Sequence, residues 1–541
     1  MTQLCVSIPV DAPEDAGRAL ASAVRAGERG ATMVEWRVDS LAECTGAAAE
    51  IRGLVRRSPL PSIVTIRAAS EGGAWEGSDA DRVSILEAVC TGAPEDAPAY
   101  IDVELASWQR SANLRQKVLL CVDHPAQVRP VPTRLILSAH DFGGRPQALV
   151  RQVAAMAEVE ACAVAKVAWT ARSVRDCVEA FELLHARPKP MIALCMGEAG
   201  VMSRVLAAKF GAFLTYARAG GPGDADAAAA SAVGTAPGQP TVDELIDRYG
   251  FARIGPRTRV FGVVGWPVSH SRSPDLHNRW FAEVGRDAVY VPIPVAPEWE
   301  PFKAAMAELL GHAPLDFRGA SVTLPHKEHL VRFVRERGGT VDALAARIGA
   351  ANTLTVGSDG ALRCTNTDAP AAVEALCAGM GVDVARLRDL RVAVLGAGGV
   401  ARAVAAGLAD AGARVVVFGR TAERVRTLCD DLMRGPGGGP GGCGPLEGRV
   451  VAGRMSELGC GCFHAFVNCT PVGMEGGPDP DGSPLPDDVP LDGSVTVMDT
   501  VYAPRRTPLL AEAAARGATC IDGWSMFERQ ARRQFELWPA D

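Results

Sequence analysis

A lysine inside an apolar run is the first residue of this 541-residue chain whose setting suggests chemistry. Lys166 stands in AVAKVAW, where the removal of water can free an amine to act as a nucleophile. His140 ends another apolar run, RLILSAHD. An amine, a histidine and several arginines together predict imine chemistry on an anionic carbonyl substrate. Taken singly, Lys166 could instead snorkel or pair with a carboxylate, and His140 could be a satisfied core histidine.

A glycine-rich turn is the corresponding signal in the second half. The run RVAVLGAGGVARAVAAGLADAGARVVVFGRTAER predicts a strand, a glycine-rich turn, a helix and a second strand. Gly396, Gly398 and Gly399 would let a pyrophosphate approach the backbone at the helix N-terminus. Arg420 follows the second strand, where an NAD site would have Asp or Glu, and Arg424 comes one turn later. NADP is therefore the expected cofactor, the alternative being a solvated basic turn.

A lysine and a carboxylate precede this turn. Lys327 in SVTLPHKE and Asp368 in TNTD could shuttle a proton to or from an alcohol oxygen while hydride moves at the carbon. Each of them alone could also be a member of a surface ion pair. Ser271 and Ser273 in SHSRSP and Asn352 in GAANTL add polar groups to the same region.

Eight strand-like runs would position the residues of the first half. They are LCVSIPV, MVEWRVD, SIVTIRA, AYIDVEL, RLILSAHD, AVAKVAW, MIALCMG and AFLTYA. Separated by mostly helical segments, they predict a closed parallel (β/α)8 TIM barrel with its chemistry at the C-terminal strand ends. The polar residues there are Glu35, Arg37, Asp39, Arg67, Glu71, Asp102, Glu104, His140, Asp141 and Lys166. A ninth run, QKVLLCV, is assigned to the end of a helix because SWQRSANLRQ before it has a helical pattern.

The stretch 236–274 separates two patterns of strands and helices. TVDELIDRYG predicts a short amphipathic helix that Thr241 caps and Gly250 ends. RVFGVVGWP then begins a second pattern, with strands predicted at FGVVG, VYVPIPV, GASVTLP and NTLTV. The final DGWSMFERQARRQFELW predicts a helix that packs back on this subdomain.

The first half resembles type I 3-dehydroquinate dehydratase. The motifs EWRVD, TIRAASEGG, DVEL, SAHDF, the lysine strand, MGEAGVMSR and APGQP follow in the family's order and cover essentially the whole half. The resemblance implies that Lys166 forms the imine with the substrate ketone. It also implies that His140 removes the adjacent proton and assists loss of the hydroxyl as water, while Glu71 orients His140.

The same resemblance implies further substrate contacts. Arg204 would clamp the substrate carboxylate together with Gln239 from the closing loop. Ser7, Glu35, Arg37 and Arg67 would hold ring hydroxyls and order the site. Tyr216 and Thr235 stand where the family tends to have phenylalanine and serine. The low-complexity run 217–234 between them is expected to be a mobile loop that could alter lid closure.

The second half resembles shikimate dehydrogenase over its whole length. The motifs, in order, are SHSRSPDLHN, SVTLPHKE, GAANTL, NTD, GAGGVARA, GRT, NCTPVGM, DTVYAP and GWSMFERQ. The resemblance implies that Lys327 and Asp368 are the catalytic pair, and that Ser271 and Ser273 bind the substrate carboxylate. Ring hydroxyls would be held by Thr323, Asn352 and Gln530, with Tyr502 lining the same pocket.

The residues expected at NADP come from the glycine-rich turn, the basic turn and two later motifs. They are Gly396, Ala397, Gly398, Gly399, Val400, Arg420, Thr421, Arg424, Thr470, Met474 and Gly523, with Asn468 flanking the nicotinamide region. Three departures from the family stand out. Ser321 replaces the Asn of many bacterial members, as in the plant-type fused enzymes, NTDAPAA lacks the usual glycine after NTD, and Gly419 replaces the usual Asn before Arg420.

The bulk composition excludes several classes of protein. With 48% hydrophobic and 22% charged residues the chain is of ordinary globular type, and its net charge of −7 without a Lys/Arg run favours neither nucleic acid nor membrane surface. No 18-residue apolar segment and no secretory signal are apparent. The 15 cysteines without a CxxC pair predict reduced thiols in a cytoplasmic protein and no metal site. The run 434–448 is expected to be disordered.

The sequence therefore predicts an α/β chain, with a TIM barrel followed by a two-subdomain dehydrogenase that contains a Rossmann NADP-binding domain. The expected boundaries are 1–250 for the barrel, 256–368 for the substrate-binding subdomain, 369–508 for the Rossmann subdomain and 509–541 for the returning helix. The order of the halves matches the bifunctional family known best from plants, so the chain is expected to convert 3-dehydroquinate to 3-dehydroshikimate and then to shikimate.

Other interpretations stay open at this point. The barrel could be another lysine-imine enzyme such as a class I aldolase, the dehydrogenase could prefer quinate, or one half could be a degenerate regulatory scaffold. A monomer is expected, with a homodimer through the barrel as the alternative.

Overall fold

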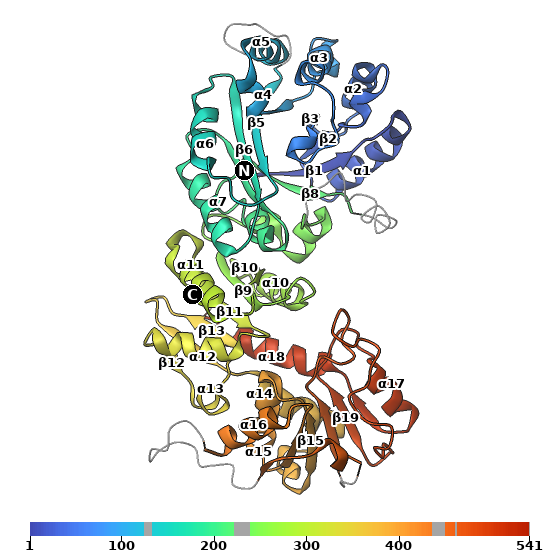
Figure 1. The fold of residues 1–541 in the computed structure, drawn as a ribbon, viewed down its shortest axis with the longest axis vertical. Helices are drawn as coiled ribbons and strands as arrows, with labels where there is room; N and C mark the ends of the chain where they lie inside the picture. Colours follow the sequence, from blue (N-terminus) through green and yellow to red (C-terminus); the bar gives the residue numbers. More distant parts are fainter. Residues whose placement is uncertain (124–131, 221–237, 435–448, 460–462, 540–541) are drawn as a thin grey trace. The chain divides into compact units, whose positions relative to one another are not determined.

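The computed structural model describes residues 1–123, 132–220, 238–434, 449–459 and 463–539. They form two compact units (Figure 1). The first comprises 1–262, 268–295 and 304–317, and the second comprises 263–267, 296–303 and the chain from 318 onward. The subdomain boundaries expected from the sequence stay predictions. The predicted mobile loop beyond residue 220, Thr235 and most of the run 434–448 lie outside the described residues.

Eight parallel strands form the sheet of the first unit. They are β1 (Gln3–Pro9), β2 (Met33–Arg37), β3 (Ser62–Thr65), β4 (Tyr100–Glu104), β5 (Arg134–Asp141), β6 (Cys162–Thr170), β7 (Met191–Met196) and β8 (Leu214–Arg218). Their order is β7-β6-β5-β4-β3-β2-β1-β8. The two edge strands approach each other where the Phe213 N–H donates to the Met191 carbonyl, at 2.8 Å. The predicted barrel is thus confirmed.

Helices surround these strands (Figure 1). They are α1 (Ala16–Glu28), α2 (Ala47–Arg56), α3 (Asp79–Cys90), α4 (Leu105–Arg110), α5 (Ala112–Cys121), α6 (Leu149–Glu158), α7 (Val174–Ala186) and α8 (Val201–Val205). The run QKVLLCV lies mostly in α5, so its assignment to the end of a helix is confirmed.

The strand period of two explains why polar groups face the barrel interior. One residue from each strand builds a buried apolar layer, namely Cys5, Met33, Ile63, Tyr100, Ile136, Val164, Ile192 and Leu214. Two residues further along, the same face carries Ser7, Glu35, Thr65, Asp102, Ser138, Lys166, Leu194 and Tyr216. Lys166 therefore points inward because Val164 does, and its carboxylate and hydroxyl neighbours do so for the same reason.

The seam after the barrel folds much as its sequence indicates. The Thr241 hydroxyl accepts from the Glu244 N–H at 3.0 Å, and the Glu244 carboxylate accepts from the Thr241 N–H at 2.8 Å, which is a capping box. Gly250 ends the helix with a φ of 63°. The segment differs from expectation in its winding, because η7 (Glu244–Arg248) is a π-helix. It leads through η8 (Phe251–Arg253) to β9 (Arg259–Gly265), α10 (Ser273–Glu283) and β10 (Ala288–Pro294).

The second unit contains a parallel six-stranded sheet of the order β17-β16-β15-β18-β19-β20. Its strands are β15 (Arg391–Leu395), β16 (Arg414–Phe418), β17 (Val450–Ala452), β18 (Ala465–Asn468), β19 (Thr496–Asp499) and β20 (Thr519–Ile521), and its helices are α14 (Asp368–Met380), α15 (Gly399–Asp410), α16 (Ala422–Arg434) and α17 (Pro508–Ala515). The strand, turn, helix and strand predicted for the glycine-rich run are β15, α15 and β16, as a Rossmann unit requires.

A smaller set of elements precedes this sheet in the sequence. It includes α11 (Trp299–Gly311), β11 (Phe317–Val322), α12 (Lys327–Glu336), β12 (Thr340–Val341), α13 (Ala343–Ile348), β13 (Thr353–Val356) and β14 (Leu362–Thr365). β13 pairs antiparallel with both β11 and β14. All four strand runs predicted here coincide with strands of the structure, namely β9, β10, β11 and β13.

The last helix, α18 (Gly523–Leu537), is fixed to β11 and β13 by polar contacts. The Gln534 side chain accepts from the Ser321 hydroxyl at 2.6 Å and donates to the Asn352 carbonyl at 3.0 Å. The indole N–H of Trp538 donates to the Leu354 carbonyl at 3.0 Å.

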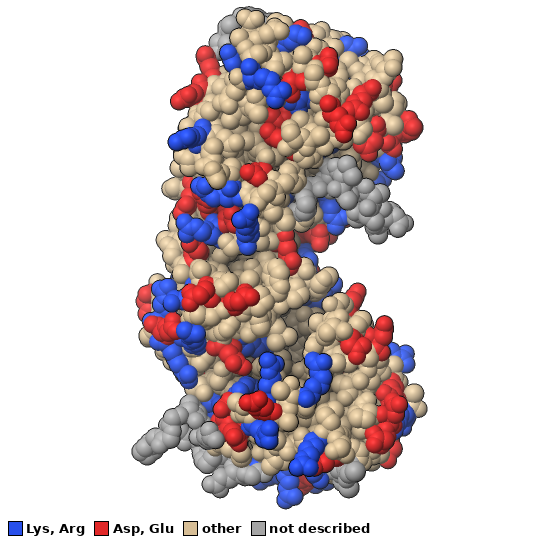
Figure 2. Space-filling view, in the orientation of Figure 1, with Lys and Arg blue, Asp and Glu red and all other residues tan. Residues whose placement is uncertain are grey.

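Two general features complete the fold. Among the helices in the described ranges, none combines the length and the apolar character needed to cross a bilayer. Apart from the atoms drawn in grey, basic and acidic side chains are intermixed over the face shown in Figure 2.

Candidate functional sites

Lys166 lies inside the barrel among carboxylates. Its ammonium nitrogen is 2.8 Å from Asp102 Oδ2 and 3.5 Å from Glu35 Oε1, and it lies 4.5 Å from the centre of the Tyr216 ring. The side chain is 6% exposed. Although burial alone would raise it, the charges of Lys166 and Arg37 lower the pKa of Glu35, so this carboxyl is ionised at neutral pH. Lys166 is therefore paired with carboxylates, as the alternative interpretation expected. The pair lies among the strand-end residues predicted to form the site.

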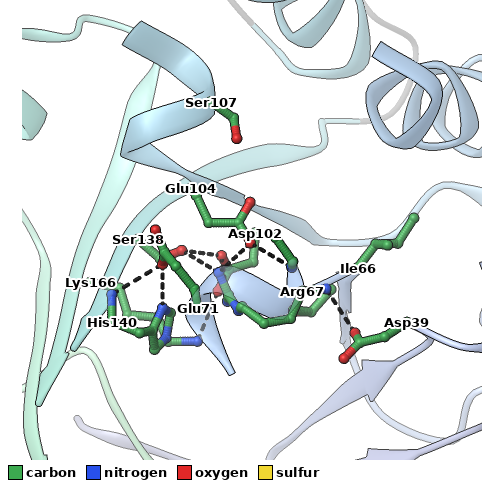
Figure 3. Close-up of polar contacts among 12 residues, drawn as sticks. Asp39, Ile66, Arg67, Glu71, Asp102, Glu104, Ser107, Ser138, His140 and Lys166 are labelled. Atoms are coloured by element: carbon green, nitrogen blue, oxygen red, sulfur yellow. Dashed lines mark hydrogen bonds and ion pairs between the residues drawn. The ribbon is translucent and has the colours of Figure 1, made fainter. Parts of the chain in front are cut away.

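A row of alternating charges extends from Lys166 to the barrel wall. Figure 3 shows its part from Lys166 through Asp102 and Arg67 to Glu104. Asp102 Oδ1 is 2.8 Å from the Arg67 guanidinium, which also lies 3.1 Å from Glu104. Glu104 in turn lies 2.5 Å from Arg82 of α3. Despite burial, Arg67 and Lys166 hold the pKa of Asp102 well below its usual range. Each buried charge thus has an opposite charge on either side, except at the two ends of the row.

Sequence reasoning placed Asp102 and Glu104 at a strand end but gave them no role, and it missed Ser138 and Arg82. The Ser138 hydroxyl donates to Asp102 Oδ1 at 2.5 Å. Arg82 also contacts Asp79 at 2.8 Å and donates to the Ser107 hydroxyl at 2.8 Å. The role of Asp102 could have been inferred from its position on the inward face of DVEL, whereas no local pattern marks Arg82 in its helix.

His140 and Glu71 form the second pair of the barrel. Both the ring nitrogen Nδ1 and the backbone N–H of His140 contact Glu71 Oε2, at 3.0 and 3.1 Å. Burial, followed by the positive charges of Arg67 and Lys166, lowers the pKa of His140 well below its usual value. The ring is therefore neutral at neutral pH. Burial raises the pKa of Glu71 to about 7, and the charge of Arg67 opposes the rise.

Arg204 is a buried cation without a partner among the described residues. Its side chain is 1% exposed, and its Nε and Nη2 have no hydrogen-bond acceptor. Burial lowers the pKa of Arg204 to about 10, so it stays charged at neutral pH. The side-chain nitrogen of Gln239 and the hydroxyl of Tyr216 are likewise buried and unpaired. Unpaired buried polar atoms are costly, so these groups are suited to a polar, anionic ligand.

The remaining barrel residues expected at the site support these groups. The Ser7 hydroxyl donates to Glu35 Oε2 at 2.6 Å, and Arg37 pairs with Asp39 at 2.6 Å. Thr235 lies outside the described residues.

The second unit brings the other predicted pair together. Lys327, the first residue of α12, is 2.6 Å from Asp368, the first residue of α14, and both side chains are buried. Beside them, the Asn352 amide donates to the Thr367 hydroxyl at 2.9 Å and to the Gln530 side chain at 3.3 Å. The lysine, the aspartate and the amide therefore share one polar cluster.

The glycine-rich turn fits a nucleotide pyrophosphate. Gly396 has a φ of 119°, and a Cβ there would lie 3.0 Å from the Cys469 carbonyl. Gly398 has open space around it, at the N-terminus of α15. A Cβ on Gly399 would lie 3.3 Å from the Lys327 side chain, so the turn lies against the proton-transfer pair. The position of α15 against α14 depends on close packing, because Gly407 of α15 lies against the Ala369 backbone of α14.

The basic turn after β16 fits a 2′-phosphate. Arg420 and Arg424 are exposed, and no ion pair of either is recorded among the described residues. Thr421 lies between them, and Ala397 and Val400 belong to the glycine-rich turn and the first turn of α15. Thr470 donates to the Asn468 amide oxygen at 2.7 Å in the loop that also carries Met474.

The other predicted residues occupy varied positions. Thr323 follows β11, and Gly523 begins α18 against the Val501 carbonyl. The Tyr502 ring stacks on Phe527 with 4.4 Å between centres. Ser271 and Ser273 lie in the segment 268–295, which belongs to the first unit. Their role stays a prediction.

Comparison with known families covers both halves. The model of type I 3-dehydroquinase matches residues 4–256, that of the shikimate dehydrogenase substrate binding domain matches 263–354, and that of shikimate/quinate 5-dehydrogenase matches 381–435.

Two relatives show the same division. The chain is 33% identical over 530 residues to the chloroplastic bifunctional 3-dehydroquinate dehydratase/shikimate dehydrogenase of Arabidopsis thaliana, and the match covers 95% of this chain and 78% of that protein. It is 41% identical over 284 residues to the shikimate dehydrogenase (NADP(+)) of Paramagnetospirillum magneticum, covering 52% of this chain and 93% of the relative.

Solved structures of similar description also match. The shikimate 5-dehydrogenase of Thermus thermophilus in complex with NADP(H) and shikimate has 32% identity and a TM-score of 0.42, covering 52% of this chain and 93% of its own. Dehydroquinate dehydratase and shikimate dehydrogenase from S. pombe has 24% identity and a TM-score of 0.39, covering 99% and 95%. Both TM-scores lie below 0.5, so the family assignment rests on the sequence matches.

By these matches the protein is an enzyme of two classes, a type I 3-dehydroquinase (lyase) followed by an NADP-dependent shikimate dehydrogenase (oxidoreductase). The whole chain belongs to the family of bifunctional 3-dehydroquinate dehydratase/shikimate dehydrogenases.

The row of charges generates a prediction for Arg82. In Arg82→Met, the buried Glu104 loses one of its two cations and keeps only Arg67. Breaking a buried ion pair leaves an uncompensated charge, so the free energy of unfolding should fall by about 3 kcal/mol in urea titrations. Arg110→Ala is the matched control, because Arg110 lies 2.7 Å from Asp79, which Arg82 also contacts, but is 66% exposed, and its loss should cost less than about 1 kcal/mol. Equal stability losses in the two variants would contradict the prediction.

The raised pKa of Glu71 predicts a pH-dependent stability. The folded protein holds this proton more tightly than the unfolded chain, whose reference value is 4.5, so the stability that Glu71 contributes below about pH 4.5 is lost as pH rises through 7. Glu71→Gln removes this loss. Urea unfolding of variant and wild type should show their difference in stability shifting in favour of the variant from pH 5 to pH 8, by at most about 3 kcal/mol. A difference that is the same at both pH values would refute the assignment.

Proposed function

We propose that Lys166 and His140 carry out the dehydration of 3-dehydroquinate and that Lys327 and Asp368 carry out the reduction of 3-dehydroshikimate. The observation that carries this proposal is the meeting of each predicted pair in a buried site: Lys166 among carboxylates with a neutral histidine in the same barrel, and Lys327 at 2.6 Å from Asp368 beside a glycine-rich turn.

In the barrel, the amine of Lys166 adds to the ketone carbon to give a carbinolamine, and the C=N bond forms as the former carbonyl oxygen leaves as water. The protonated imine draws electrons from the neighbouring carbon. His140 then takes the proton of that carbon at Nε2, because its Nδ1–H donates to the Glu71 carboxyl group and Nε2 is left as the acceptor. His140 returns the proton to the departing hydroxyl, which leaves as water. Hydrolysis of the imine restores the lysine.

The substrate carboxylate is assigned to Arg204 and Gln239. A carboxylate accepts two parallel hydrogen bonds from a guanidinium, and Arg204 has two nitrogens without acceptors. Binding of the substrate thus supplies the negative charge that Arg204 lacks among the described residues of the free protein. The contacts to the ring hydroxyls are assigned to Ser7, Glu35, Arg37 and Arg67. Tyr216 and Thr235 are assigned to the region that closes over the substrate.

In the dehydrogenase, Lys327 donates a proton to the oxygen of the former ketone, and Asp368 keeps the ammonium in place. The reduced nicotinamide, when bound, supplies the hydride. We assign the substrate carboxylate to Ser271 and Ser273. The ring contacts are assigned to Thr323, Asn352, Tyr502 and Gln530.

The cofactor is assigned to the two turns at the ends of β15 and β16. The backbone of the glycine-rich turn and the N-terminus of α15 would hold the pyrophosphate. Arg420, Thr421 and Arg424 would hold the 2′-phosphate. Thr470, Met474 and Gly523 are placed at the nicotinamide end.

Two single-site variants, Lys166→Ala and Lys327→Ala, test the assignment of the two activities separately. With 3-dehydroquinate and NADPH, the wild type should oxidise NADPH, whereas Lys166→Ala should do so only when 3-dehydroshikimate is supplied. Lys327→Ala should still dehydrate 3-dehydroquinate but oxidise no NADPH. Borohydride with 3-dehydroquinate should trap an adduct on Lys166 alone. An untouched Lys166, or faster reduction of 3-dehydroquinate than of 3-dehydroshikimate, would overturn the corresponding half.

The unpaired Arg204 predicts a trade-off between stability and activity. Arg204→Met removes a buried charge that has no partner among the described residues of the free protein, so the variant should be at least as stable as wild type, with a gain of up to about 3 kcal/mol. Its dehydratase kcat/KM should fall by roughly a hundredfold or more, the loss expected when a buried charge partner of the substrate is removed. Thermal unfolding and the dehydratase assay check the two halves of this prediction. A destabilised variant with normal activity would contradict it.

Two coarser expectations complete the proposal. We propose a monomer, because every residue assigned to either reaction comes from one chain, and a homodimer in light scattering would refute it. We propose the cytoplasm as compartment, because the cysteines of the described segments are free thiols and most are buried.

A further inference from the structure

The loop SHSRSP of the dehydrogenase is hydrogen-bonded to residues of the dehydratase half within the first unit. The Ser269 N–H donates to Glu198 Oε1 at 3.0 Å. Glu198 begins η5 (Glu198–Gly200), two residues after the end of β7 and six residues before Arg204. The proposed dehydratase mechanism gives Glu198 no part, and its carboxylate is otherwise unexplained.

A second anchor holds the other end of the same loop. Arg248, the last residue of η7, donates to the Ser271 carbonyl at 2.9 Å and lies 3.0 Å from the Asp275 carboxylate. Inside the loop, the Ser273 N–H donates to the Ser271 hydroxyl at 3.3 Å. One carboxylate and one guanidinium of the barrel half therefore hold the loop backbone at Ser269 and Ser271, and the guanidinium also holds the Asp275 side chain after Ser273.

Glu198 is also in contact with the dehydratase side. A Cβ on Gly238 would lie 2.5 Å from the Gly197 carbonyl and 3.1 Å from the Glu198 nitrogen, so the chain that carries Gln239 packs directly on this turn. The backbone that sets the position of Glu198 is thus shared with the segment assigned to the barrel substrate.

We propose that Glu198 and Arg248, residues of the dehydratase half, are positioning residues for the dehydrogenase. They hold the Ser269–Ser273 backbone in the conformation that presents the Ser271 and Ser273 hydroxyls to the carboxylate of 3-dehydroshikimate. The inference rests on the proposed role of these two serines. Ordering the loop before the substrate arrives lowers the entropy lost on binding, so its effect falls on KM rather than on kcat.

The test uses the full-length protein and both assays. Glu198→Ala and Arg248→Met should each raise KM for 3-dehydroshikimate roughly threefold to tenfold, the worth of one hydrogen bond, with kcat and KM for NADPH within twofold of wild type. Glu198→Gln keeps an acceptor oxygen and should restore KM. Arg175→Ala is the matched control, because Arg175 of α7 pairs with Glu308 of α11 and has no recorded contact with the loop among the described residues, so it should change nothing. Dehydratase activity of each variant reports that the barrel is folded.

Ser271→Ala separates the proposed role of the serines in substrate binding from the proposed positioning role of Glu198 and Arg248. If it leaves KM for 3-dehydroshikimate unchanged, the serine assignment fails and the inference fails with it. If Ser271→Ala raises KM while Glu198→Ala and Arg248→Met do not, the serine assignment stands and the positioning role is overturned. An equal rise in Arg175→Ala, or a loss of kcat in place of a rise in KM, would also overturn it.

Discussion

The dehydratase half depends on the compensation of buried charge. A charge removed from water is costly unless an opposite charge and hydrogen bonds surround it, and breaking such a pair typically costs about 3–5 kcal/mol. The barrel meets this constraint with a row in which Arg82, Glu104, Arg67, Asp102 and Lys166 alternate in sign. The strand period supplies the inward positions, and α3 supplies the cation at the wall. Lys166 is therefore buried beside a carboxylate, Asp102, that it shares with Arg67.

Arg204 of the same barrel lacks such compensation in the part of the chain that the structure describes. Its guanidinium is as deeply buried as Arg67, yet two of its nitrogens have no acceptor among the described residues. Such a charge favours any ligand that brings an oxyanion to it, because binding removes a penalty that the free protein carries. The fold thus compensates the charges around Lys166 and leaves Arg204, the residue that we propose for the substrate carboxylate, without an acceptor at two of its nitrogens among the described residues.

Features encoded by a local sequence pattern could be predicted from the sequence. Apolar runs predicted the strands. The polar residues at the strand ends, Lys166, His140 and Glu71 among them, were expected to gather because a parallel barrel brings strand ends together. The glycine-rich turn was equally local. Arg82 was missed because Glu104, its partner in the row of charges, lies 22 residues further along the chain and the sequence of α3 gives no sign of a buried guanidinium. Glu198 was missed because its partner, a backbone N–H of Ser269, exists only once two halves with separate patterns have packed.

The two lysines that we propose as catalytic differ in the surroundings of the aspartate beside them. Asp102, which lies 2.8 Å from Lys166, also contacts Arg67 and the Ser138 hydroxyl. Asp368 lies 2.6 Å from Lys327, and no second cation is recorded at it among the described residues. A carboxylate that contacts two cations couples them, so the surroundings of Lys166 depend on Arg67, whereas Lys327 and Asp368 form a simple pair. The difference between the two sites therefore lies in the partners of each aspartate and not in the lysine side chain.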